Sequence, residues 1–469
     1  MILGAVFERF LAKSPLTVMA RATIEHALSA SALDALFEAT AEHGYTRTLL
    51  FSTVVDLMSR VVSGKAQTVQ SAYQQQEDQI PVTLKSVYEK LQNIETEVSA
   101  ELVRHVGGRC HALITQLGGG RPPVLPGRRV RIVDGNHLAA TQKRLAVTRG
   151  HTAGPRPGQT LAILDPDPML VTDLIPCEDG HTQERALIDA VVPKVHEGQV
   201  WVADRNFCTV EFLSRIDQRE AFFVIRRHGN MTVEPDRSGE WTRDGETETG
   251  RVSERPVWLC VGGERVLLVR CVRVRLNQPT EDGDSEIEIL TNLSVDEADA
   301  VKVADVYRGR WAIEGAFHEL TVALRCEVRT LGYPKAALFG FAVAVLAYNV
   351  LAVLKAALRA VHGVDKVQNE VSGYYVALEW ATVYSGMMIA VPDPEWVVFG
   401  TMPAEQLAQL LRTWAARINV KKIKKSPPRP PTKKKAERIN DSSPHVSTAR
   451  LLDDAKKNRQ AQNRQRKQG

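Results

Sequence analysis

The segment RRVRIVDGNHL (residues 128–138) is a short run rich in β-branched residues that ends at Asp134, which predicts a buried strand followed by a loop. The preceding segment GGGRPPVLPGRR (residues 118–129) is rich in Gly and Pro and is typical of the start of a domain. From here onward, strand patterns and helix patterns alternate along the chain.

The next segments continue this alternation. TLAILDPDPMLVTDLIP (residues 160–176) predicts two strands around a turn at residues 165–168, and TQERALIDAVVPKV (182–195) predicts a helix. GQVWVADRNF (198–207) predicts a second buried strand, which ends at Asp204, and a further helix and strand follow at residues 209–218 and 220–227. This succession predicts an α/β fold with a mixed sheet covered by helices.

The sequence pattern divides the chain into five regions. Residues 1–120 repeat apolar side chains at three-to-four spacing and predict an N-terminal helical domain. Residues 128–228 and 294–420 are expected to form the two parts of the α/β core, and residues 229–293 an inserted, mainly β module. Residues 421–469 are basic, of low complexity and rich in Pro at their start, which predicts a disordered tail.

Composition describes an ordinary globular protein with an uneven charge. The 469 residues are 44% hydrophobic and 25% charged, which excludes disorder throughout. The net charge is +5, but residues 421–469 contain sixteen Lys or Arg against four acids and carry +12. Residues 1–420 therefore carry −7, and a tail of this charge suits either a solubilising extension or nonspecific binding to nucleic acid.

The six cysteines are scattered, without the pairing or His spacing of a zinc site. No disulfide framework is indicated, and a cytoplasmic location is expected. The 19-residue apolar run from Ala336 to Leu354 is long enough to span a bilayer. A helix that is apolar all round is also typical of the central helix of a large core, and this second interpretation is favoured, so we expect no membrane partner.

The segment YRGRWAIEGAFHE (residues 307–319) predicts an amphipathic helix with polar groups on one stripe. Steps of three and then four residues bring Tyr307, Arg310 and Glu314 onto the same face. A solvated face with an ordinary Arg–Glu pair is the simple interpretation. Glu319 lies about 140° further around such a helix and is expected to point elsewhere.

Three carboxylates in this chain form a candidate metal site. Asp134 and Asp204 both follow buried strands, where turn residues and helix caps are common but where sites in sheet proteins also gather. Together with Glu314 they offer the oxygen ligands that Mg²⁺ prefers. Two such ions stabilise the attacking and leaving oxygens of a phosphodiester displacement.

IVDGNHL, VADRNF and YRGRWAIE, in this order and with a β module between the second and third, resemble the DDE transposases of bacterial insertion sequences, in the insertion-sequence-four family. The resemblance covers roughly residues 128–358. It implies an RNase H-like core, with Asp134, Asp204 and Glu314 as catalytic ligands of two Mg²⁺ ions, for which Mn²⁺ can substitute. It also implies that Tyr307 and Arg310 face the DNA backbone at the transposon end.

The family signature continues with a Lys seven residues after the Glu, and here that position is Thr321. This departure bears on end binding and on activity, and Arg325, one helical turn beyond, is the candidate substitute. Trp241 is the candidate for stacking on a base flipped out beside the cleavage point, an interaction of about 1–3 kcal/mol. His137 is a candidate phosphate contact, and a loop histidine without function is an equal alternative.

The function implied by the resemblance is that of a metal-dependent DNA transposase, which cleaves at the ends of its element and joins the 3′ ends to target DNA. Its partners would be double-stranded DNA, at the transposon ends and at the target, and a second copy of the chain as a homodimer on DNA. The N-terminal helical domain is the candidate reader of the end sequence. An RNase H-fold nuclease and a catalytically inactive DNA-binding protein derived from a transposase remain as alternatives.

Overall fold

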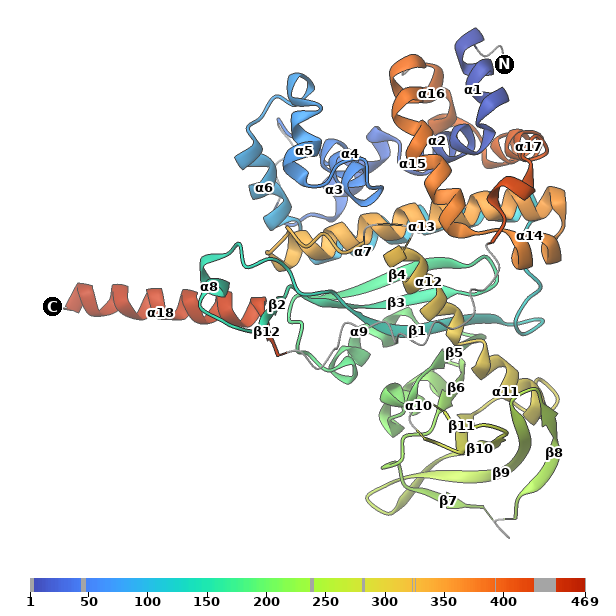
Figure 1. The fold of residues 1–469 in the computed structure, drawn as a ribbon. Coiled ribbons are helices and arrows are strands. Elements are labelled where there is room, and N and C mark those ends of the chain that lie inside the picture. The colour runs from blue at the N-terminus through green and yellow to red at the C-terminus, as the bar shows by residue number, and fades with distance from the viewer. Residues whose placement is uncertain are drawn as a thin grey trace, which may run out of the picture.

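The computed structural model describes residues 4–43, 48–236, 240–280, 283–322, 324, 326–392, 394–425 and 444–468. Within these residues ten strands form one large sheet, and helices cover it on both faces (Figure 1). Arg325 and residues 426–443 of the tail lie outside the described residues.

Helices form a layer on one side of the sheet, at the top of Figure 1. Its N-terminal members are α1 (Ala5–Lys13), α2 (Pro15–Ala27), α3 (Ala30–Thr40), α4 (Phe51–Val62), α5 (Val69–Gln74), η1 (Glu77–Gln79), α6 (Leu84–Asn93) and α7 (Thr96–Leu117). Its later members are α13 (Pro334–His362), α14 (Val364–Glu370), α15 (Gly373–Ala390), α16 (Pro394–Thr401), α17 (Ala404–Ala415) and η5 (Val420–Ile423). The helical character predicted for residues 1–120 is therefore present, but these helices pack together with the C-terminal ones rather than standing apart.

The first half of the large sheet has the order β4-β3-β1-β5-β6. Its strands are β1 (Arg129–His137), β3 (Gln159–Asp165), β4 (Leu170–Cys177), β5 (Gln199–Ala203) and β6 (Phe222–Arg226). β1 pairs antiparallel with β3, and β3 with β4, whereas β1 with β5 and β5 with β6 pair in parallel. The predicted mixed sheet is confirmed.

The connections in this half are shorter and more broken than the sequence predicts. The expected helix at 182–195 is divided into η2 (Glu184–Leu187), α9 (Ile188–Val191) and η3 (Val192–Lys194), with Pro193 in the last of them. A proline removes a backbone donor from a helix, which favours such interruption. η4 (Arg205–Phe207) and α10 (Val210–Asp217) follow β5, and the short α8 (Ala146–Arg149) and β2 (Gly154–Arg156) lie between β1 and β3.

Alternate residues of these strands face two separate cores. Ile132 and Val202 belong to the core that the large helices share, whereas Val133 and Trp201 belong to a second core with α9 and α10. This is the two-residue period of a strand buried on both faces.

The β pattern at residues 229–293 forms β7 (Val233–Pro235), β8 (Thr242–Thr247), β9 (Gly250–Val261), β10 (Glu264–Leu276) and β11 (Glu286–Thr291). These strands do not form a detached sheet, because β11 pairs with β6 and so extends the large sheet in the order β6-β11-β10-β9-β7. β8 pairs with β9 beside this path. α11 (Ala300–Arg308) and α12 (Trp311–Val322) then return the chain to the helical layer.

The long apolar run forms α13, which is the central helix of the core, as the favoured interpretation predicts. It has the length and composition of a membrane span, but its most apolar 18-residue window is wholly buried inside the protein. It lies along α7 over the sheet (Figure 1). The amide of Asn349 in this helix bonds both the N–H and the C=O of Val171 on β4, at 3.0 and 2.8 Å.

The prediction of a disordered tail is wrong for its described part. Residues 445–447 form β12 (His445–Ser447), which pairs in parallel with β2, and α18 (Thr448–Gln468) follows. α18 extends away from the body of the protein, at the left of Figure 1. The composition that suggested disorder is that of an exposed helix, whose described residues beyond Ala455 are all exposed.

Candidate active site

Asp134 and Asp204 occupy equivalent places on two neighbouring parallel strands. The register of β1 and β5 ends with the pair Ile132 and Val202, and each aspartate stands two residues beyond that pair. Because side chains alternate along a strand, both aspartates share the face of Ile132 and Val202, which is the face covered by the large helices. The sequence predicts that the strand ends at Asp134, but β1 continues to His137, so Asp134 lies within β1 and Asp204 directly follows β5.

Glu314 joins them through Arg310. The guanidinium of Arg310 donates from Nη1 to Oδ2 of Asp134 at 2.8 Å and from Nη2 to Oε1 of Glu314 at 2.9 Å. Asp204 also lies within its electrostatic reach. Arg310 thus links two of the three carboxylates directly, and only its electrostatic interaction connects it with the third.

The helix predicted over residues 307–319 is interrupted at this point. α11 ends at Arg308, α12 begins at Trp311, and Gly309 and Arg310 form a turn between them. The turn places Arg310 on the acids with its side chain 11% exposed, whereas a continuous surface helix would leave it in water. The Arg–Glu pair of the simple interpretation is therefore present, but its arginine is buried rather than solvated.

Burial and neighbouring charges alter the ionisation of this cluster. The pKa of Asp134 is raised to about 7, first by burial and then by the negative charges of Asp204 and Glu184, although Arg310 acts in the opposite direction. Burial also raises the pKa of Tyr307. Burial acts to lower the pKa of Arg310, but Asp134 and the other anions outweigh it and raise that pKa.

Glu184 is a fourth carboxylate of the cluster, and sequence reasoning missed it. Its Oε2 accepts a hydrogen bond from Nδ2 of Asn206 at 3.2 Å, and burial followed by the charge of Asp204 raises its pKa. A Cβ at Gly135 would lie 1.9 Å from its Oε1, so a larger residue at that position would require the carboxylate to move. The only hint in the sequence was Gly135, directly after Asp134, because a glycine can mark a place where another group approaches the backbone closely.

The other predicted residues are distributed more widely. Tyr307 is close to Arg310 but only 8% exposed. His137 is the last residue of β1 and lies on the surface. Thr321 is exposed on α12, with its hydroxyl bonded to the carbonyl of Phe317 at 2.9 Å.

Trp241, the candidate for stacking on a base, is half-buried. It directly precedes β8 and packs against the second core. The guanidinium carbons of Arg273 and Arg255 lie 3.8 and 4.3 Å from the centre of its ring. Stacking on a base would require at least one of these arginines to move.

Glu319 points away from the cluster, as expected from helix geometry. Its two carboxylate oxygens accept hydrogen bonds from Nζ of Lys355 on α13, at 2.5 and 2.7 Å. Asp165 is likewise occupied elsewhere, in ion pairs with Arg129 and Arg131.

The donor set suits a hard divalent cation. Carboxylate oxygens are the ligands of Mg²⁺ and Mn²⁺, and these carboxylates already converge on a positive group. That positive group is the guanidinium of Arg310, whose buried Nε has no hydrogen-bond partner. Within the described residues, no group of three or more Asp, Glu, His or Cys side chains is placed to hold a metal ion as it stands. The residues fit a divalent cation in their chemistry, provided that Arg310 turns away from them.

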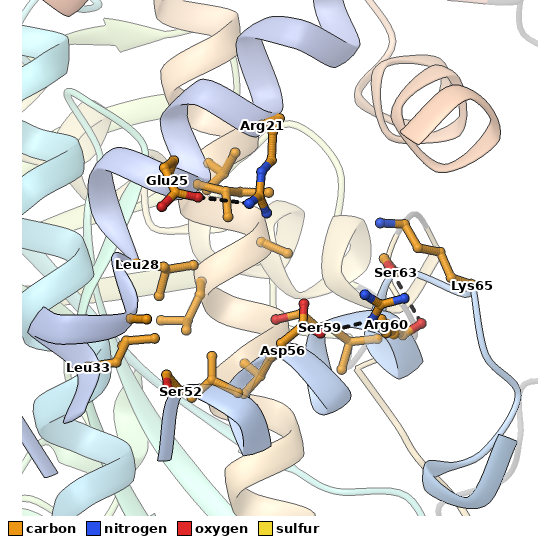
Figure 2. A pocket seen from close by; sticks show the side chains of 18 residues that line it. Arg21, Glu25, Leu28, Leu33, Ser52, Asp56, Ser59, Arg60, Ser63 and Lys65 are labelled. Carbon is orange, nitrogen blue, oxygen red and sulfur yellow. Dashed lines mark hydrogen bonds and ion pairs between the residues drawn. The ribbon is translucent and has the colours of Figure 1, made fainter. Parts of the chain in front are cut away.

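A cavity of about 250 Å³ lies elsewhere, between α2, α4 and the apolar wall of α13 (Figure 2). In it Arg21 pairs with Glu25, and Arg60 with Asp56. Burial, followed by the charge of Arg60, lowers the pKa of Lys65 to about 6. None of the residues predicted from the sequence for the active site lines this cavity.

Residues 125–350 match the model of the transposase DDE domain, a range that contains Asp134, Asp204 and Glu314 and ends within α13. A search of curated proteins found no match. The family match thus supports a DDE transposase domain in this part of the chain.

Among solved structures, the chain is similar to one described as the cryo-EM structure of the piggyBac transposase synaptic complex with hairpin DNA. The identity is 12%, the TM-score is 0.36, and the alignment covers 88% of this chain and 78% of that one. A likeness of this size adds no argument about function.

Proposed function

We propose that this protein is a DDE transposase, which cleaves DNA at the ends of a mobile element and joins the 3′ ends to target DNA. One observation carries the proposal. Asp134, Asp204 and Glu314 come from separate parts of a region that matches the transposase DDE domain; Arg310 bonds the first and the third, and the charge of Asp204 acts on Asp134. A cluster of this kind costs stability, because like charges repel when buried, and such clusters are typical of functional sites.

The strand arrangement supports an RNase H-like core as part of this proposal. A hairpin of two antiparallel strands follows β1, and two parallel strands continue the sheet on its other edge. The Tyr307, Arg310 and Glu314 spacing supports the insertion-sequence-four family and hence a bacterial element. A homodimer on DNA and a cytoplasmic location belong to the same proposal.

Asp134, Asp204 and Glu314 would hold two divalent cations, Mg²⁺ or Mn²⁺. When bound, such ions activate an attacking oxygen and stabilise the leaving oxygen of a phosphodiester. The protein's own contribution is to hold one carboxylate within β1, one directly after β5 and one on α12. Arg310, turned away from the acids, is within reach of a DNA phosphate, to which a guanidinium donates two hydrogen bonds.

A catalytically inactive DNA-binding protein is the second candidate. Arg310 occupies the centre of the acidic cluster, and Thr321 stands where the signature has a lysine. Both features favour a chain that binds DNA without cutting it. An RNase H-fold nuclease has the same acids, so only the products of the reaction distinguish it.

The test uses DNA from the borders of this gene, incubated with the protein and Mg²⁺, and compares the wild type with Glu314→Gln. Glu319→Gln is the matched control, because it removes a carboxylate from the same helix that pairs with Lys355 instead. We expect joined products from the wild type and the control, and neither cut nor joined DNA from Glu314→Gln, because the proposed metal ligand is lost. Cut but unjoined DNA indicates the nuclease, and bound but intact DNA the inactive protein.

A further inference from the structure

A groove of about 550 Å³ adjoins the acidic cluster. Glu184 and Asn206 line it, and both also belong to the surroundings of the acids. Its remaining walls carry two guanidinium groups, from Arg156 and Arg185. The imidazoles of three histidines line it as well: His137, His181 and His445. The groove is thus a site rich in hydrogen-bond donors beside a cluster of carboxylates.

The far end of the chain builds one wall of this groove. β12 pairs in parallel with β2, with His445 opposite Gly154, and the N–H of Gly154 donates to the carbonyl of Pro444 at 3.0 Å. The ring of His445 meets that of His181 edge-on, with centroids 4.9 Å apart. These contacts fix the C-terminal segment next to the groove.

Arg450 adds an ion pair to this attachment. Its Nε lies 2.7 Å from Oδ2 of Asp179, which precedes the loop that leads to Glu184. The first turn of α18 is therefore fastened to the same loop that supplies the fourth carboxylate. A free solubilising extension has no need of such contacts.

α18 continues from this anchor as a cationic helix. Residues 448–468 contain seven Lys or Arg and two Asp, a net charge of +5. Lys456, Lys457 and Arg459 are exposed. At 1.5 Å per residue the helix is about 30 Å long, comparable with one turn of duplex DNA at 3.4 Å per base pair.

We propose that the groove and α18 form one surface that binds the phosphodiester backbone of duplex DNA as it leads to the acids. The inference rests on the proposed function and adds where the DNA lies. Arg156 and Arg185 contact phosphates next to the point of cleavage, and α18 contacts the backbone further along. Guanidinium groups suit this task because they donate paired hydrogen bonds to phosphate.

The experiment measures the affinity of the full-length protein for a fluorescent 30-base-pair duplex, without divalent cations, at a series of KCl concentrations. One variant is Arg156→Gln/Arg185→Gln, in the groove, and another is Lys456→Gln/Lys457→Gln, in α18. The matched control is Lys366→Gln/Arg417→Gln, which removes two exposed cations at α14 and after α17, far from α18 (Figure 1). Circular dichroism checks that each variant is folded.

Each phosphate contact contributes roughly 0.9 to the slope of log affinity against log salt concentration. We therefore expect the slope to fall by about 1.8 in the groove variant and in the α18 variant, and to stay unchanged in the control. Equal slopes in all four proteins would overturn the inference while leaving the proposed function intact. A wild type that does not bind the duplex at low salt would instead count against the proposed function itself.

A single-stranded oligonucleotide of the same sequence completes the design. We expect it to bind more weakly than the duplex and to respond less to the α18 substitutions, because a flexible strand does not follow a straight helix. Stronger binding of the single strand, with the groove variant alone affected, would contradict the assignment of duplex DNA to this surface.

Discussion

Arg310 is the residue on which the acidic cluster depends in the described structure. Its two terminal nitrogens bond Asp134 and Glu314, so it offsets the repulsion among carboxylates that would otherwise separate or take up protons. A divalent cation would have to replace this guanidinium. Ion binding and the position of Arg310 are thus coupled.

The raised pKa of Asp134 makes folding stability depend on pH. In the folded protein its pKa is about 7, against an ordinary value of 3.8, so between these values the folded state binds more protons than the unfolded one. Stability from this group is therefore fully present below about pH 4 and is lost as the pH rises to 7. Relative to Asp134→Asn, the metal-free wild type should lose unfolding free energy over this window.

Urea unfolding of both proteins at several pH values between 4 and 8 measures the difference. Comparison with Asp134→Asn removes the contribution of the other titrating groups. Two parallel curves would show that the carboxyl of Asp134 ionises normally and that burial does not perturb it.

Substitution of Gly135 tests whether Glu184 takes part in the reaction. In Gly135→Ala the new Cβ would lie 1.9 Å from Oε1 of Glu184, so the fourth carboxylate must move. A displacement of about 1 Å in a reacting site costs about 10²-fold in rate. We expect a loss of that order in DNA cleavage, and a similar loss in Glu184→Gln.

Gly315→Ala is the control for this measurement, because Gly315 follows Glu314 as Gly135 follows Asp134, and a Cβ there meets nothing within 4 Å. Alanine in this helix should leave cleavage unchanged and stabilise the fold by up to about 1 kcal/mol. If Gly135→Ala cleaves as well as Gly315→Ala, Glu184 has no role in the reaction.

The sequence could supply the three acids but not the fourth. Asp134 and Asp204 follow strands with a clear apolar pattern, and Glu314 stands in a recognisable spacing with Tyr307 and Arg310. Glu184 lies in a short 3₁₀ turn of an irregular segment, where no periodicity indicates which way a side chain points. Only the tertiary fold brings its carboxylate near β1, beside Gly135.

A side chain of helix α13 supplies hydrogen bonds to backbone groups of an edge strand of the sheet. β4 is the last strand of the sheet, and the amide of Asn349 bonds the backbone of Val171 in place of a further strand. Asn349→Leu would leave the N–H and the C=O of Val171 buried without partners. Each such group costs about 1–3 kcal/mol, so the variant should lose roughly 2–6 kcal/mol of unfolding free energy.

Chemical denaturation of Asn349→Leu beside Leu346→Met tests this account. The second variant changes a buried side chain of the same helix at nearly constant volume and should cost less than about 1.5 kcal/mol. An Asn349→Leu protein as stable as the wild type would mean that water or backbone movement satisfies Val171.

Local sequence patterns predict where helices and strands occur better than they predict where a helix is interrupted. The hairpin of β3 and β4 and the alternation of β1 and β5 are confirmed. The interruption between α11 and α12 was not foreseen, because Gly309 is tolerated within a helix and nothing local requires a turn there. The turn places Arg310 in an ion pair with Asp134, a residue far away in sequence.

At the scale of the whole molecule, the tail differs most from expectation. Composition gives no indication that residues 445–447 pair with β2, since that pairing depends on a strand almost 300 residues earlier. In the same way β11 joins the inserted strands to the core sheet through β6. Long-range pairing of this kind is set by tertiary contacts, which local patterns do not contain.

The central claim is that the acids contributed by β1, β5 and α12 hold divalent cations. Electron paramagnetic resonance of Mn²⁺, titrated into the protein with duplex DNA present, measures this directly. We predict that the wild type removes Mn²⁺ from the free pool and that Asp204→Asn and Glu314→Gln remove much less, whereas Glu319→Gln binds as the wild type does. Equal Mn²⁺ binding by all four proteins, or none by the wild type, would contradict the account.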